Sequence, residues 1–240
     1  MCANSGVKRV DLQINSGGMA KFPKTEISIV HGFSTMLLEN MSKKYGNPNQ
    51  AMRNQKRALS LLQFSTEMMV KMVPWHTDKI EVVNRSHRGE GVECDALITS
   101  RRQVGLMLLP ADCYPVIITG DDNERYSSMA LVHSGRKGTR LGIVAKTIQK
   151  MKEFGVNPSS ARVAIGPGIG PCCYNGTDLV PEIVEQVIEE GVPEKNIVVA
   201  NCCTCCSRDS QGEYLFFSHA RAQREQGEQN GRFMAFSVLG

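Results

Sequence analysis

Short apolar segments of strand length are the feature that most restricts the fold of this sequence. Val104 to Leu109, Tyr114 to Thr119, Ser128 to Val132 and Arg162 to Ile165 are each dominated by apolar residues and end at polar or glycine-containing turns. Runs of about four to eight apolar residues between turn signals are typical of strands buried inside a sheet. Such segments outnumber the expected helices and do not alternate with them strictly. The sequence therefore predicts an α+β fold with a mixed sheet.

Fewer segments have the spacing of an amphipathic helix, in which apolar residues recur three or four positions apart. The helices expected on this basis are Gln50 to Phe64, Thr139 to about Phe154, Asp178 to Glu190 and Ser218 to Glu228. Further strands are expected at Ile27 to Val30, Lys79 to Asn84, Asn196 to Ala200 and Arg232 to Val238. Residues 1–26 are expected to form a poorly packed N-terminal arm or an edge strand, and residues 27–240 a single domain.

Charge and composition argue against several classes of function. The net charge is only +4, the basic residues are scattered, and 6% of the residues are aromatic, so no nucleic-acid surface is expected. The first twenty residues lack the apolar core of a signal peptide, and no apolar run is long enough to cross a membrane. The nine cysteines are an odd number and include adjacent pairs. These features predict a cytoplasmic protein with free or metal-bound thiols.

Two histidines and one cysteine stand at the ends of expected strands. His133 follows an apolar strand, His76 precedes one, and the polar pair Asp112-Cys113 interrupts two apolar runs. Two imidazoles and one thiolate suit Zn²⁺, and copper less well. Three protein ligands leave a fourth coordination position open, as in catalytic zinc sites. The competing interpretation is a buried, inert cysteine in a tight turn. The wide spacing of the three residues matches no local zinc motif.

Three other motifs carry weaker signals. Cys202-Cys-Thr-Cys-Cys206 has no second half at zinc-finger spacing, so an incidental or structural role is favoured over redox chemistry or metal binding. The segment from Gly166 to Tyr174 is rich in glycine, but Pro167 and Pro171 remove backbone donors that a phosphate loop needs. A close backbone approach remains a use for these glycines. Ser134 to Gly138 at a helix start is either an anion site or a solvated basic turn.

Several segments, in this order, resemble the family of multicopper polyphenol oxidoreductases, or bacterial laccase-domain proteins, which are regarded as purine nucleoside-processing zinc enzymes. The resemblance covers about residues 27 to 238. The segments that carry it are His31-Gly-Phe-Ser-Thr35, Asp95-Ala-Leu-Ile-Thr99, Ala111-Asp-Cys-Tyr-Pro-Val116, Val132-His-Ser-Gly135 with Gly138, Gly166 to Tyr174, and Phe216-Phe-Ser218 with Gly231-Arg232.

The resemblance implies a single domain with a mixed β-sandwich flanked by helices. It also implies that Cys113 and His133 are metal ligands, with His76 as the third and His87 as the competing candidate. The implied activity is zinc-dependent phosphorolysis of a purine nucleoside such as adenosine, inosine or methylthioadenosine, with adenosine deaminase activity beside it. The expected partners are therefore a small-molecule nucleoside and phosphate, and the expected assembly is a monomer or a small homo-oligomer.

The residues around this expected site depart from the family pattern. The family's Gly-Trp-Arg-Gly is Gly135-Arg136-Lys137-Gly138 here, its Asn-Arg is Asn54-Gln55, and its Ser-Tyr-Arg-Arg is Ser218-His-Ala-Arg221. Arg136 and Lys137 are candidates for holding phosphate because of their charge and their position. Asp112 is expected to orient a ligand or to carry a proton. Asn54 is a further candidate for binding substrate.

Three other functions use the same residues. A copper-dependent phenol oxidase would need several copper centres, and five scattered histidines do not supply them. A cysteine hydrolase would use Cys113 as nucleophile and His133 as base. A binding module without catalysis would keep the metal for stability alone.

Overall fold

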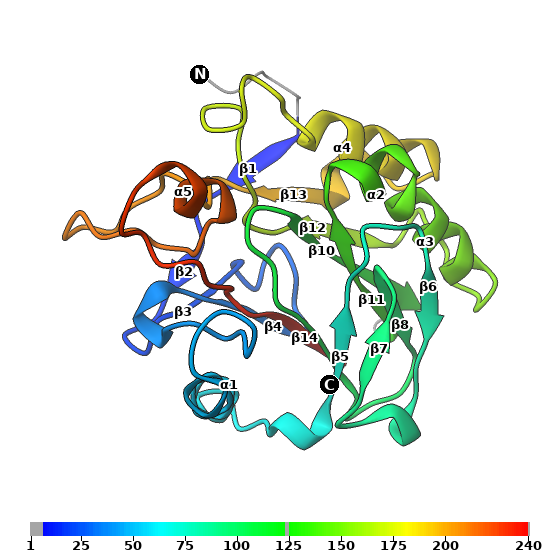
Figure 1. Ribbon diagram of the computed structural model, residues 1–240. Helices are drawn as coiled ribbons and strands as arrows, with labels where there is room; N and C mark the ends of the chain where they lie inside the picture. Colours follow the sequence, from blue (N-terminus) through cyan, green and yellow to red (C-terminus); the bar gives the residue numbers. More distant parts are fainter. Residues whose placement is uncertain (1–6, 123–124, 240) are drawn as a thin grey trace.

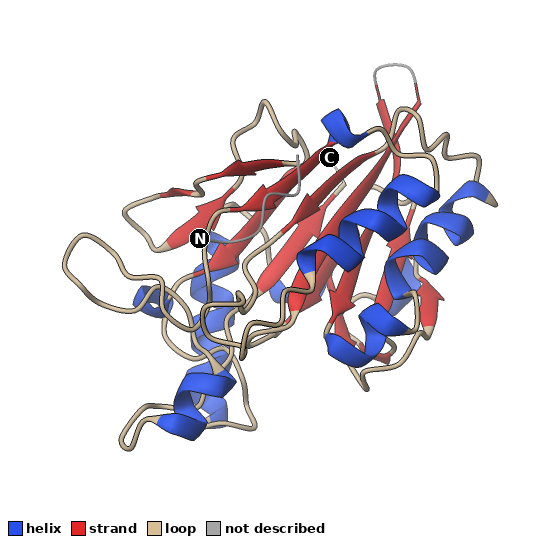
Figure 2. Ribbon diagram, turned by 90° about the horizontal axis from the view of Figure 1, so that it is seen from above, coloured by secondary structure: helices blue, strands red, loops and turns tan. Residues whose placement is uncertain are grey.

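Two mixed β-sheets packed face to face form the centre of the molecule, and helices cover their outer faces (Figures 1 and 2). The computed structural model describes residues 7–122 and 125–239. This architecture confirms the predicted α+β fold with a mixed sandwich.

Within the described residues, each sheet has seven strands and combines parallel with antiparallel neighbours. The first sheet runs in the order β1 (Lys8–Val10), β13 (Ile197–Ala200), β12 (Arg162–Ile165), β10 (Tyr114–Asp122), β11 (Arg125–Ser134), β8 (Ala96–Thr99) and β6 (Ile80–Val82). The second runs in the order β2 (Gln13–Ile14), β3 (Met19–Lys21), β4 (Val30–Ser34), β14 (Ala235–Val238), β9 (Gly105–Leu108), β5 (Met69–Val73) and β7 (Gly91–Glu93).

The helices are short, and among the described residues none is both long and apolar enough to cross a membrane. They are α1 (Pro48–Ser60), α2 (Arg136–Arg140), α3 (Ile143–Lys152), α4 (Val180–Glu189) and α5 (His219–Arg224). Short 3₁₀ turns lie at η1 (Met36–Leu38), η2 (Thr66–Met68), η3 (Arg85–His87) and η4 (Glu194–Asn196).

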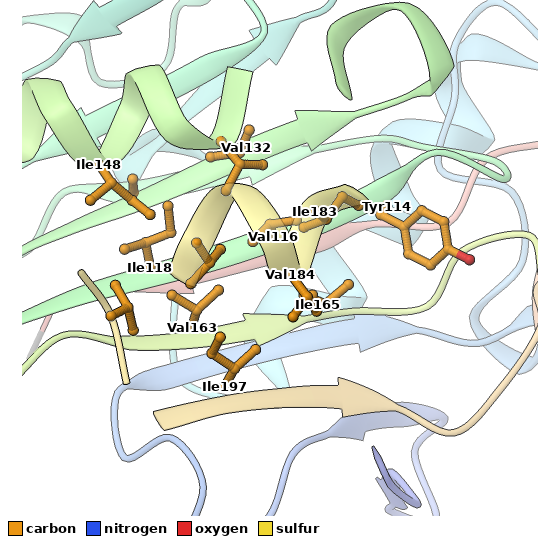
Figure 3. Packing of buried hydrophobic residues seen from close by; sticks show 14 of the residues in the cluster. Tyr114, Val116, Ile118, Val132, Ile148, Val163, Ile165, Ile183, Val184 and Ile197 are labelled. Carbon is orange, nitrogen blue, oxygen red and sulfur yellow. The ribbon is translucent and has the colours of Figure 1, made fainter. Parts of the chain in front are cut away.

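The central strands of the first sheet are buried on both faces, which explains their near-continuous apolar sequences. Along β10, Val116 and Ile118 belong to the core shared with α3 and α4, where Ile148 and Ile183 pack (Figure 3). Ile117, between them, points the other way into the core between the two sheets. Because side chains alternate along a strand, a strand with two buried faces needs apolar residues at every position.

Three details of the chain differ from the sequence-based expectations. The N-terminal arm is better packed than expected, since Met19, Ala20 and Phe22 are fully buried. The helix expected from Thr139 to Phe154 is broken into α2 and α3 at Gly142, whose φ of 76° is a left-handed conformation suited to glycine. Strands β5, β7 and β8 were missing from the expected set of elements; β7 has the burial pattern of a mostly exposed edge strand.

Candidate metal centre

Strand register brings the three predicted ligands to one end of the first sheet. In the antiparallel pair β10 and β11, Tyr114 lies opposite Ser134 and Pro115 opposite His133. Cys113, immediately before β10, is therefore carried close to His133 and Gly135. His76 arrives from the loop between β5 and β6.

The ligand atoms of His76, Cys113 and His133 all lie within 4.8 Å of one another. The Cys113 Sγ is 3.8 Å from His76 Nε2, and the two imidazole rings are 4.8 Å apart at a tilt of 77°. His133 is buried, Cys113 is half-buried and His76 is exposed. One side of the trio is thus open to solvent, which leaves a coordination position for water or substrate.

A buried carboxylate, Asp95, organises two of the three ligands. Its Oδ1 accepts hydrogen bonds from His133 Nδ1 and from the His76 backbone N–H, both at 2.9 Å. Its Oδ2 accepts from the backbone N–H and the hydroxyl of Thr77, at 2.8 and 2.7 Å. A carboxylate on Nδ1 sets the histidine tautomer, so Nε2 of His133 is left to bind a metal.

The electrostatics of the trio favour a thiolate. Burial alone would raise the pKa of the Cys113 thiol, but His133 and His76 lower it to about 6. Burial alone would lower the pKa of His133, but Cys113 and Asp95 raise it. Hydrogen bonds from His133 and Thr77 overcome the opposite effect of burial and hold the pKa of Asp95 well below its usual range. Cys113 is therefore prepared to act as a metal ligand or as a nucleophile.

We expect Cys113 in metal-free protein to be alkylated by iodoacetamide with a midpoint near pH 6, because its thiolate forms at lower pH than an ordinary thiol. His133→Ala should move this midpoint upward, since it removes the neighbouring cation. Peptide mapping by mass spectrometry across a pH series measures both. An unchanged midpoint in the variant would show that His133 does not stabilise the thiolate.

The backbone around the trio leaves room for an ion. A Cβ added at Gly135 would lie 2.6 Å from Cys113 Sγ and 3.3 Å from a carbon of the His76 ring, so only glycine fits there. His76 and Asp112 both have positive φ angles, of 57° and 84°. Strained conformations of this kind cluster at functional sites. Soft and borderline donors around a space kept clear of side chains fit Zn²⁺.

The trio lies in a cavity of about 620 Å³, a size typical of small-molecule sites. Both sheets and the segment around α5 contribute to its walls. Tyr45 and Tyr174 provide aromatic surface, while Lys44, Arg136 and Arg232 provide positive charge. The cavity can therefore accept a molecule that combines a flat apolar part with an anion.

Arg232 is the best-placed of these cations. Its half-buried guanidinium stacks 4.1 Å from the centre of the Tyr45 ring. Its hydrogen bonds go to the neutral oxygen atoms of Asn230 and Gly231. An anion in the cavity would thus find a partly desolvated guanidinium whose own hydrogen bonds go to neutral groups.

Asp112 is held firmly beside Cys113. Its Oδ1 accepts a hydrogen bond from the Thr204 hydroxyl at 2.8 Å, and its Oδ2 accepts from the Ala220 backbone N–H at 2.7 Å. Both oxygens are engaged by protein donors, so the geometry suits a residue that positions its neighbours.

The remaining sequence candidates are dispersed. Arg136 lines the cavity, whereas its exposed neighbour Lys137 is not among the lining residues. Asn54 is buried on α1, where it donates to the Asn40 carbonyl at 2.9 Å. Gln55 likewise donates to the Met41 carbonyl. His87 lies in η3, where its ring contacts Asn84.

Sequence reasoning missed Asp95 and Arg232 as site residues, although both fall in segments that carried the family resemblance. A detectable signal existed for Asp95, since a carboxylate directly before a fully buried strand must find hydrogen-bond partners. Nothing local marks Arg232, because its role depends on Tyr45 and on the cavity.

Comparison with known proteins gives matches over most of the chain. Residues 31–189 match the family described as multi-copper polyphenol oxidoreductase laccase. A purine nucleoside phosphorylase of Corynebacterium glutamicum is 34% identical over 157 residues, which are 64% of this chain and 61% of that protein. The purine nucleoside phosphorylase YlmD of Geobacillus stearothermophilus is 30% identical, and the match covers 82% of this chain and 82% of that protein. A purine nucleoside phosphorylase of Clostridium acetobutylicum is 35% identical, and the match covers 68% of this chain and 73% of that protein.

Solved structures show the same fold. The crystal structure of YlmD from Geobacillus stearothermophilus superposes with a TM-score of 0.83 at 26% identity, covering 95% of this chain and 98% of that one. A Bacillus licheniformis hypothetical protein, YfiH, superposes with a TM-score of 0.82 at 24% identity, covering 95% of this chain and 99% of that one.

Proposed function

Because the chain belongs to the family described as multi-copper polyphenol oxidoreductase laccase, with curated relatives named purine nucleoside phosphorylases, we propose that it is a zinc-dependent purine nucleoside phosphorylase. Its substrates would be adenosine, inosine or methylthioadenosine together with phosphate. The observation that carries the proposal is the trio of His76, Cys113 and His133 inside a cavity with aromatic and cationic walls.

The chain's own residues have separate tasks in this reaction. Phosphate attacks C1′ of the ribose, the glycosidic bond breaks, and the purine leaves with the bonding electrons. Arg136 and Arg232 would hold the phosphate, and Tyr45 and Tyr174 would contact the base. His76, Cys113 and His133 would hold the zinc, which supplies a Lewis acid and lowers the pKa of a bound water to roughly 7. The same chemistry supports deamination of adenosine as a second activity.

The test is phosphorolysis by protein freed of metal and then reloaded with zinc. We expect base release from adenosine plus phosphate to fall on chelation and to return when the protein is reloaded with zinc. Chromatographic detection of adenine and ribose 1-phosphate measures the reaction, and inosine as product reports deamination. Full turnover by the metal-free protein would contradict the proposal.

Arg136→Gln is expected to lower kcat/KM for phosphate by about 10- to 100-fold, since a hydrogen bond to a charged group contributes roughly 1.5–3 kcal/mol. Lys137→Gln is the matched control. It removes the same charge from the next residue, which is exposed and not among those lining the cavity, and should change kcat/KM little. Initial rates at varied phosphate separate the two. Equal losses in both variants would mean that the two residues act only through the attraction of their positive charge for phosphate, and that Arg136 makes no direct hydrogen bond to it.

The copper-oxidase alternative has little support in the site. All five histidines fall in the described residues, but only His76 and His133 belong to the trio. His31 is buried, and its ring contacts Phe22 and Ile29. His219, at the start of α5, lines the cavity outside the trio. Several copper centres cannot be built from this set.

The cysteine-hydrolase alternative is favoured by one observation, the lowered pKa of Cys113 beside two histidines. A hydrolase of this kind would work without metal and would form an acyl-enzyme. Activity that survives chelation, with an acyl group trapped on Cys113, would support it. Activity that depends on zinc would support the phosphorylase.

A further inference from the structure

Two cysteine segments far apart in the sequence meet beside Ile169 and Tyr174, which line the cavity. The loop after β12 carries Cys172 and Cys173, and the loop after β13 carries Cys203 and Cys206. The four sulfur atoms lie within 4.8 Å of one another. In the sequence, Cys202 to Cys206 lacks a second pair of cysteines at zinc-finger spacing. The fold brings Cys172 and Cys173 beside it as that second pair.

The separation of the sulfur atoms fits a single ion. Cys172 Sγ and Cys206 Sγ are 3.7 Å apart. In a tetrahedral site with Zn–S bonds of roughly 2.3 Å, neighbouring sulfur atoms are about 3.8 Å apart. A disulfide would instead need a separation of about 2 Å. The four sulfur atoms are therefore close enough together to share one ion.

Cys203 and Cys206 form the C-x-x-C turn that is common in structural zinc sites. The backbone N–H of Gly170 donates to Cys203 Sγ at 3.2 Å, and the N–H groups of Cys205 and Cys206 also face this sulfur. N–H donors around one sulfur stabilise it as a thiolate, which is the form that binds a metal.

Adjacent cysteines rarely reach one ion, but here the turn at Cys172 and Cys173 brings both sulfur atoms to the same side. This turn is closed by the Cys173 N–H, which donates to the Gly170 carbonyl at 3.0 Å. Arg224 connects the two loops, since its guanidinium donates to the Cys173 carbonyl at 2.9 Å and to Cys205 Sγ at 3.2 Å. Its positive charge offsets part of the charge that four thiolates bring together.

From this geometry we infer a second zinc site, a closed tetrathiolate centre formed by Cys172, Cys173, Cys203 and Cys206. Four protein ligands leave no open position, so the role is structural. The ion would join two loops that also shape the cavity: Ile169 and Tyr174 line it, and Thr204 donates to Asp112 beside Cys113. The inference rests on a different set of residues from the proposed function.

Metal analysis of protein purified without added metal tests the site. We expect two zinc ions per chain in the wild type and one after the double change Cys172→Ser and Cys206→Ser. Cys202→Ser is the matched control, because Cys202 lies in the same loop outside the group of four, and it should keep two. His133→Ala should lose only the other ion. If the double variant keeps as much zinc as the wild type, the inference is overturned.

The outcomes separate this inference from the proposed function. One ion in the wild type that persists in His133→Ala and disappears in the double variant would support the cysteine site and contradict zinc at the trio. The reverse pattern would contradict the cysteine site alone.

A second measurement needs no variant. Cys172 and Cys206 are exposed, so iodoacetamide at alkaline pH, where thiolates form, can reach both sulfur atoms unless an ion holds them. We expect them to be protected in the native protein and to react after chelation without any reductant, as read by peptide mapping. Rapid reaction before chelation would overturn the inference. Protection that ends only with a reductant would show a disulfide and would overturn it equally.

Discussion

His133→Ala and Cys113→Ala should each lower kcat/KM for adenosine phosphorolysis by about 10³-fold, because a bound metal contributes several kcal/mol and each 1.36 kcal/mol is tenfold in rate. In the wild type, the ligand atoms of all three residues lie within 4.8 Å of one another. Either change leaves only two of these ligands. The zinc should be lost from the trio in parallel. Steady-state kinetics and metal content, measured on the same preparations, check the result.

His76→Ala has a natural control in His87→Ala. His76 belongs to the trio, whereas His87 lies in η3 with its ring against Asn84. We expect His76→Ala to lose zinc and activity as His133→Ala does, and His87→Ala to keep both. If His87→Ala were the variant that lost zinc, the assignment of the first ligand would be wrong.

Asp95→Asn should weaken zinc binding by about 10- to 100-fold, the usual effect of removing a carboxylate that orients a histidine ligand. It should also lower the free energy of unfolding by about 3–5 kcal/mol, because a fully buried ionic partner of His133 is removed. The amide cannot accept all the hydrogen bonds that reach Asp95 from His76, Thr77 and His133. Zinc titration and urea unfolding measure the two effects.

Asp78→Asn is the matched control, since Asp78 forms an exposed ion pair with Lys146. Solvent screens an exposed pair, so this variant should unfold nearly as the wild type does. Equal destabilisation by both changes would show that the hydrogen bonds of Asp95 contribute no more to the free energy of unfolding than an exposed ion pair does.

The pH dependence of stability gives Asp95 a second signature. Its pKa is lower in the folded protein than in the unfolded chain. Its contribution is therefore complete above its unfolded pKa of about 3.9 and is lost as the pH falls below that value. The stability difference between wild type and Asp95→Asn should shrink in acid. A difference that stays constant from pH 7 to pH 3 would contradict this.

Much of the secondary structure could be predicted from the sequence, because apolar runs and helical spacing are properties of neighbouring residues. Arg162 to Ile165 was expected as a strand and is β12. The helix expected from Gln50 starts at Pro48, since the Asn47 side chain caps it by accepting from the N–H groups of Asn49 and Gln50. Expected helix ends overran the observed ones at α5, which closes at Arg224. Ends depend on capping and packing more than on periodicity.

The sequence by itself determined the kinds of atoms available: imidazoles and a thiolate at strand ends, cysteines in two loops, and apolar runs long enough to bury a sheet on both faces. The tertiary structure decided which of them meet. The register of β10 and β11 places Cys113 beside His133, and the packing of two loops places Cys172 near Cys206. Asp95 became part of the site only because β8 lies next to β11. Spacing along a chain does not encode distances across a sheet, because those are set by long-range pairing once the hydrophobic faces are buried.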